Sequence, residues 1–177
     1  PLTGRTTGTL LSSRDLTRIL GKPDTGKPSG LRDRAILETL YSAGIRKREL
    51  LNLEVRDLDH ERGLITIRTE HGDRLAPIGF SALAWLEKYL RESRPRYVSA
   101  GEEQTLFLTN RGGRFSSSGL ARRVGKYLGT GKGACALIRR SVAALMLKNG
   151  ADILHVRAML GGGNPAKQSL LREVTAE

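Results

Sequence analysis

Basic side chains gather around one predicted helix and carry the clearest chemical signal in the sequence. They lie before, along and just after residues 116–128: Arg111, Arg114, Arg122, Arg123, Lys126 and Lys132. Lysine and arginine side chains bind the phosphate backbone of DNA because they release the counterions condensed on it. A run of charge is also typical of a solvated helix face, but this stretch favours contact with DNA phosphates.

The composition of the whole chain supports a polyanionic partner. Of 177 residues, 30 are lysine or arginine and 18 are aspartate or glutamate, which gives a net charge of +12 and a pI near 10.5. Aromatic residues make up only 5% of the chain, which argues against a single-strand binder built on base stacking. We therefore expect duplex DNA as the partner, with a basic surface kept for solubility as the alternative.

Other kinds of site find little support in the sequence. The three histidines and the single cysteine lack metal-ligand spacing, so we expect no metal ion and no cofactor. No apolar run approaches the roughly 18 residues that span a bilayer, and the first residues lack a signal-peptide pattern. The lone Cys135 cannot form an internal disulfide. These features predict a cytoplasmic protein without membrane contact, associated with the nucleoid if it binds DNA.

The elements that position the basic residues are predicted to be mainly helical. Hydrophobic periodicity indicates helices over residues 13–20, 31–43, 47–53, 81–92, 116–128, 136–149 and 152–160. Ser12 and Asp15 form a capping-box pattern before the first helix, and Gly44 is placed to end the second. Alternating apolar residues at 63–68 and 74–78 predict a hairpin, extended by a third short strand elsewhere.

These elements predict one domain, mainly α with a small antiparallel β-sheet (α+β). Residues 1–30 are interpreted as a lead-in with a short helix and a loop at 21–30. Residues 31–177 are interpreted as the core domain, which opens on an amphipathic helix.

Three segments, in order, resemble the catalytic domain of the tyrosine recombinases, the phage integrase family, and especially its Xer-like bacterial members. The first runs from Leu31 to Leu50 and ends in a version of Gly-Leu-Arg-x-x-Glu-Leu. The second, Asp73 to Ile78, is similar to the strand Glu-Arg-x-Val-Pro-Leu. The third runs from Ile138 through the turn Asn149-Gly150-Ala151-Asp152 to Met159-Leu160-Gly161. The resemblance covers most of residues 31–174 and implies the tyrosine-recombinase fold.

The resemblance also implies where an active site would lie. In the family, a tyrosine attacks the scissile phosphate, two arginines hold its oxygens, and a lysine and histidines move protons. Arg46 and Arg139 fall on the two arginines, and Arg140 falls beside the same pocket. The other positions carry residues unsuited to those roles: Thr69 for the lysine, Ala136 and Gly162 for histidines, and Leu171 for the tyrosine.

No tyrosine follows Tyr127 in these 177 residues, so the sequence predicts a recombinase-like protein that binds phosphate without cleaving DNA. Such a pseudoenzyme would be accessory to, or derived from, site-specific recombination. The alternative for Arg46 and Arg139 is a structural role, paired with Glu49, Asp33 or a helix end.

Two other functions stay open at this stage. The chain could contribute its arginines to a recombinase whose tyrosine comes from another subunit. It could instead be a protein-interaction module or a decayed remnant, in which case the basic residues would be scattered. Possible partners besides duplex DNA are an active recombinase, or a second copy joined through a terminal helix at 168–174, as the resemblance implies.

Overall fold

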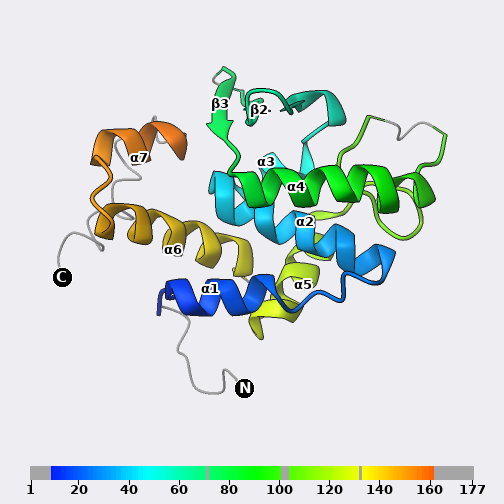
Figure 1. The fold of residues 1–177 in the computed structure, drawn as a ribbon, viewed down its shortest axis with the longest axis horizontal. Coiled ribbons are helices and arrows are strands. Elements are labelled where there is room, and N and C mark those ends of the chain that lie inside the picture. The colour runs from blue at the N-terminus through cyan, green and yellow to red at the C-terminus, as the bar shows by residue number, and fades with distance from the viewer. Residues whose placement is uncertain (1–8, 71, 101–103, 132, 162–177) are drawn as a thin grey trace.

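Helix α2 (Pro28–Ala43) runs through the centre of the molecule, with other helices on several sides (Figure 1). It contacts α1 (Ser13–Leu20), α4 (Phe80–Lys88), α5 (Ser117–Leu128) and α6 (Ala134–Lys148). The computed structural model describes residues 9–70, 72–100, 104–131 and 133–161. Among the basic positions and family positions predicted above, Lys132, Gly162 and Leu171 lie outside these residues, as does the predicted helix at 168–174.

The predicted start and the predicted amphipathic character of α2 were both wrong. The helix begins at Pro28 rather than Leu31, so the loop after α1 is shorter than expected. Proline suits a first helical turn, since its φ is fixed near the helical value and its missing N–H has no partner there. The helix is buried on nearly all sides, and even Arg32, Asp33 and Glu38 are inaccessible. Their partners inside the protein, described below, make that burial tolerable.

The start of the chain packs against the same core. Helix α1 has the predicted bounds, and its Ser12–Asp15 capping box is present. Leu16 and Ile19 are buried in one hydrophobic cluster with the apolar residues of α2. The predicted division of the chain at residue 30 falls inside α2.

The sheet has three antiparallel strands in the order β1 (Leu58–Asp59), β2 (Leu64–Ile67), β3 (Arg74–Pro77). This confirms the predicted hairpin, and the third strand is β1, which directly precedes it along the chain. Ile65 pairs with Ala76, and Ile67 pairs with Arg74. Because Ile65, Ile67 and Ala76 are buried, the register also places Arg74 on the inward face of the sheet.

The remaining elements follow the prediction with shifted ends. Helix α3 is short (Lys47–Leu51) and is followed by a 3-10 turn at Val55–Asp57. Helix α4 continues as a π-helical turn (Tyr89–Ser93) and a 3-10 turn (Arg94–Arg96) instead of an α-helix to residue 92. Helix α6 begins at Ala134, and α7 (Ile153–Met159) is capped by Asp152.

None of the helices in the described ranges has the length and apolar character of a membrane span.

Candidate phosphate-binding site

Arg46 and Arg139, far apart in the sequence, both reach the C-terminal end of α7. Arg46 lies at the N-cap of α3, and its Nη2 donates a hydrogen bond to the carbonyl of Gly161 at 3.3 Å. Arg139 lies in the middle of α6, and its Nη2 donates to the carbonyl of Leu160 at 2.6 Å. Its Nη1 donates to the carbonyl of Gly44, which ends α2. The fold therefore brings the two predicted arginines together.

A third arginine, Arg74 of β3, belongs to the same cluster. Its Nη1 and Nη2 donate to the two carboxylate oxygens of Glu49 at 2.8 and 3.0 Å, and its Nε donates to the carbonyl of Met159 at 3.2 Å. Glu49 also accepts a hydrogen bond from the backbone N–H of Arg46 at 2.7 Å. Sequence reasoning missed Arg74, although strand alternation put it on the inward face with Ala76, where a charge needs a partner.

The cluster carries more positive charge than its single carboxylate balances. Burial lowers the pKa of Arg139 to about 10, and the nearby Arg46 lowers it further while Glu49 opposes the shift. Burial alone would raise the pKa of Glu49, but hydrogen bonds from Arg74 and from the Arg46 backbone outweigh it and lower that pKa. Three arginines surround one carboxylate, so two positive charges are in excess. A partly buried site of this kind is suited to bind an anion.

The alternative prediction, in which Arg46 and Arg139 pair with Glu49, Asp33 or a helix end, holds only in part. In the part of the chain that the structure describes, neither the Arg46 nor the Arg139 guanidinium pairs with a carboxylate. Asp33 lies in a different network, and Glu49 accepts a hydrogen bond from the backbone N–H of Arg46 rather than from its guanidinium. Both guanidiniums do contact helix ends: each donates to a carbonyl at the end of α7, and Arg139 also donates to the carbonyl of Gly44 after α2.

Two of the positions that the resemblance assigns to a family histidine and lysine, Ala136 and Thr69, lie in the described part of the chain. Ala136 lies exposed on α6, one turn before Arg139. Thr69 lies in the turn between β2 and β3, where its hydroxyl donates to the carbonyl of Gly72 at 2.7 Å. Arg140, next to Arg139 on α6, is half-buried, and its Nε has no hydrogen-bond partner within the described residues.

A basic groove lies beside α5, with a volume of about 1050 Å³. Its lining combines basic side chains with hydroxyl groups and glycines: Lys47, Arg122, Lys126, Ser116, Ser117, Ser118, Thr130, Gly125, Gly129, Gly131 and Gly133, together with Ala121. Lys47 directly follows Arg46, so α3 links this groove to the arginine cluster. Sequence reasoning missed Lys47, which lies between Arg46 and Arg48 in the first family-like segment and was given no role there.

The other predicted DNA-contacting residues differ in their surroundings. Arg111 and Arg114 lie exposed on the loop before α5. Arg123 is turned inward from α5, with its Nη1 3.6 Å from Oδ2 of Asp33. Adjacent arginines on α5 thus have different environments, because Arg122 lines the groove while Arg123 faces a buried carboxylate.

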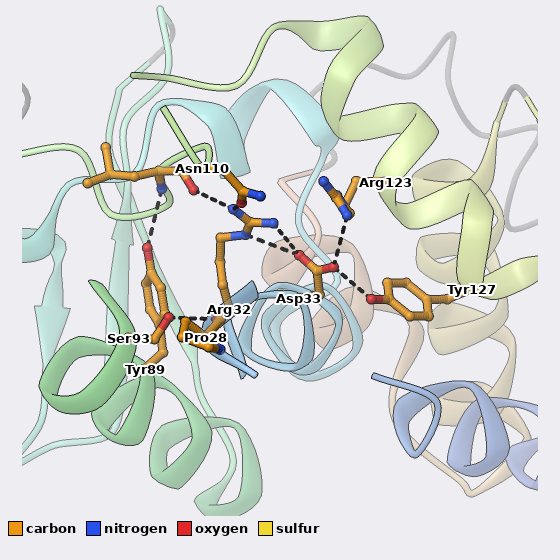
Figure 2. Close-up of polar contacts among 9 residues, drawn as sticks. Pro28, Arg32, Asp33, Tyr89, Ser93, Asn110, Arg123 and Tyr127 are labelled. Atoms are coloured by element: carbon orange, nitrogen blue, oxygen red, sulfur yellow. Dashed lines mark hydrogen bonds and ion pairs between the residues drawn. The ribbon is translucent and has the colours of Figure 1, made fainter. Parts of the chain in front are cut away.

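Asp33 is the centre of a buried network that joins α2 to α5 and to the loop before it (Figure 2). Arg32 donates to Oδ1 of Asp33 through Nε at 3.1 Å and Nη2 at 2.9 Å, and to Asn110 Oδ1 through Nη1 at 2.7 Å. The Tyr127 hydroxyl donates to the other carboxylate oxygen of Asp33 at 2.7 Å. Burial and this hydrogen bond raise the pKa of Tyr127, which therefore stays neutral. The network fixes the position of α5 relative to α2.

Comparison with known proteins identifies a family and a set of similar folds. Residues 9–167 match the phage integrase family. The chain is 43% identical over 158 residues to tyrosine recombinase XerC 2 of Ralstonia nicotianae. The aligned region covers 86% of this chain and 45% of that protein. It is 36% identical over 168 residues to tyrosine recombinase XerC of Pelotomaculum thermopropionicum, covering 90% of this chain and 55% of that one.

Solved structures give the same result for the fold. The crystal structure of XerA recombinase superposes with a TM-score of 0.76 at 26% identity, covering 99% of this chain and 65% of that one. A post-cleavage complex of XerH site-specific recombinase with a palindromic difH substrate gives a TM-score of 0.77 at 21% identity. The match covers 93% of this chain and 49% of that one. The chain spans about half the length of the curated relatives it matches.

Proposed function

This chain belongs to the phage integrase family and has the fold of a tyrosine recombinase catalytic domain, and from this premise we propose that it binds duplex DNA through an arginine clamp without cleaving it. The predicted family and fold are thereby confirmed. The proposed role is accessory to, or derived from, site-specific DNA recombination. Its relatives include recombinases whose structures contain DNA, such as XerH with difH.

The observation that carries the proposal is the convergence of Arg46 and Arg139 with excess positive charge. Among the described residues, Arg46 uses one side-chain hydrogen bond and Arg139 uses two. A guanidinium has five N–H donors, so both keep donors for the non-bridging oxygens of a phosphate. The planar fork of arginine matches such oxygens in a bidentate geometry.

The groove beside α5 supports a backbone contact that extends from this clamp. Lys47, Arg122 and Lys126 line the same cavity, whereas a remnant without a DNA role would leave its basic residues scattered. Proposed further contacts are Arg111, Arg114, Lys132 and Arg140, whereas the predicted contact at Arg123 is not proposed, because its guanidinium faces Asp33. Phosphate contacts of this kind position a protein on the duplex without reading its sequence.

The proposed absence of cleavage rests on the missing groups. Neither Ala136 nor Thr69 can take the place of a protonated histidine or lysine, and Gly162 and Leu171 lack the groups that the resemblance assigns to them. Without a nucleophile, the covalent step cannot occur within this chain. The clamp would then hold a phosphate whose ester bonds stay intact.

The test is binding of labelled duplex DNA over a salt series by the native chain and an Arg46→Ala, Arg139→Ala double variant. Each lost phosphate contact lowers the slope of log K against log salt concentration by about 0.9, so we expect the slope to fall by about 2. An Arg62→Ala, Arg91→Ala variant is the matched control, since it removes two exposed arginines that pair with neighbouring carboxylates.

Equal slopes for the two double variants would contradict the clamp, and absence of binding at low salt would contradict DNA binding altogether. Denaturing gels of the same mixtures should show no covalent protein–DNA product. If mixing with an active relative produces cleavage that depends on Arg46, the chain is instead a recombinase subunit served by a tyrosine in trans.

A further inference from the structure

The turn that ends α7 is held by three arginines from different elements. Each donates to the carbonyl of a successive residue: Arg74 of β3 to Met159 (3.2 Å), Arg139 of α6 to Leu160 (2.6 Å) and Arg46 at the start of α3 to Gly161 (3.3 Å). Three consecutive carbonyls therefore face the arginine cluster. Carbonyls at a helix C-terminus carry partial negative charge, which makes them good partners for cations.

Gly161 permits this close approach. Its φ is +68°, a conformation that L side chains rarely adopt. A Cβ atom at this position would lie 2.9 Å from Cζ and from Nε of Arg74. The Arg74 guanidinium thus lies directly against the backbone of the turn, and a Cβ at this position would displace it.

The carbonyls orient the guanidiniums without exhausting their donors. In the described part of the chain, Arg46 donates only through Nη2, and Arg139 donates once through each of Nη1 and Nη2. Since a guanidinium has five N–H groups, each arginine retains enough of them for a bidentate contact with an anion. The contacts with α7 are therefore compatible with an occupied phosphate site.

We propose that residues 159–161 are a positioning element for phosphate binding, so that docking of α7 and binding of a DNA phosphate strengthen each other. This inference rests on the proposed function, because the anion is the phosphate that Arg46 and Arg139 would hold. Preorganised guanidiniums lose less side-chain entropy when the anion arrives. Coupling between two equilibria is reciprocal, so the bound phosphate in turn holds α7 in place.

The experiment compares Gly161→Ala with Gly150→Ala. Both glycines have positive φ, +68° and +87°, so both alanines strain the backbone similarly. A Cβ at Gly150 meets no atom within 4 Å, whereas one at Gly161 collides with Arg74. We expect Gly161→Ala to bind a labelled duplex about tenfold more weakly than Gly150→Ala, the loss typical of one misplaced charge-assisted hydrogen bond.

A second measurement uses the native chain, so it decides the question even if Gly161→Ala fails to fold. Hydrogen exchange of the α7 amides is followed with and without the same duplex, and we expect DNA to slow it. If DNA binds but leaves this exchange unchanged or accelerates it, or if the two alanine variants bind equally, the positioning role is wrong while DNA binding stands. If the native chain binds no duplex at low salt, the proposed function itself is wrong, and this inference is wrong with it.

Discussion

Two arginine clusters in this molecule differ in how their charge is balanced. Around Asp33, the fully buried Arg32 shares one carboxylate with Arg123 and Tyr127, and its Nε and both Nη nitrogens donate hydrogen bonds within the protein. In the other cluster, three arginines surround Glu49, and within the described residues Arg46 and Arg139 keep N–H donors without a protein acceptor. Saturated partners indicate a structural network, whereas excess charge with unused donors indicates a binding site.

The largest effect should come from breaking the balanced cluster. We expect Arg32→Met to lower the free energy of unfolding by about 3–5 kcal/mol, because it removes the two hydrogen bonds that Arg32 donates to Oδ1 of the buried Asp33. Arg46→Met is the matched control and should cost about 1 kcal/mol or less, since it removes a single 3.3 Å hydrogen bond and relieves excess charge. Urea unfolding followed by Trp85 fluorescence measures both. Equal losses of unfolding free energy in the two variants would contradict the distinction between a structural cluster and a binding cluster.

A smaller effect is expected at Glu49, the carboxylate that lies among the three arginines. Its pKa is lowered in the folded protein, so its ion pair with Arg74 stabilises the fold above the ordinary pKa of 4.5 and is lost as pH falls through the lowered value. We expect Glu49→Gln to lower the free energy of unfolding at neutral pH by about 2 kcal/mol and to remove this part of the acid dependence.

Urea unfolding of Glu49→Gln between neutral pH and about pH 3 tests this expectation, with Glu87→Gln, which alters an exposed glutamate, as the control. If the native chain and Glu49→Gln lose stability in parallel as pH falls, Glu49 does not stabilise the cluster as described.

The smallest predicted effect separates two adjacent arginines on α5. Arg122 lines the groove, whereas Arg123 lies 3.6 Å from Asp33, so only the first has its charge available for a DNA phosphate. We expect Arg122→Ala to reduce the salt slope of duplex binding by about 1, and Arg123→Ala to leave it nearly unchanged. The salt series is the same as that for the clamp. A reversed order would mean that Arg123 leaves Asp33 when DNA binds.

The sequence predicted the elements better than the surroundings of their charged residues. Local signals were sufficient for the capping box at Ser12 and for the hairpin, because both depend on neighbouring residues. The burial of α2 on nearly all sides was missed, since Arg32 looks solvent-facing unless its tertiary partners are known. The resemblance to the family, and not hydrophobic periodicity, predicted that Arg46 and Arg139 share one site.

The members of the site that were missed have a common cause. Arg74 and Lys47 both fall in segments that resemble the family, but the resemblance gave neither of them a role, and tertiary contacts place them at the cluster and the groove. The inward turn of Arg123 depends on Asp33, which is distant in sequence. Local sequence patterns do not predict contacts between side chains that are far apart in the sequence.

The most direct test of the account observes both clusters in one experiment. Arginine Nε–H signals in 1H–15N NMR spectra of the full chain are followed during titration with duplex DNA. We predict that the Arg46 and Arg139 signals shift with DNA concentration while the Arg32 signal stays in place, because its Nε already donates to Asp33. If DNA binds and the Arg46 and Arg139 signals do not move, or move no more than that of Arg32, these arginines are not the phosphate clamp.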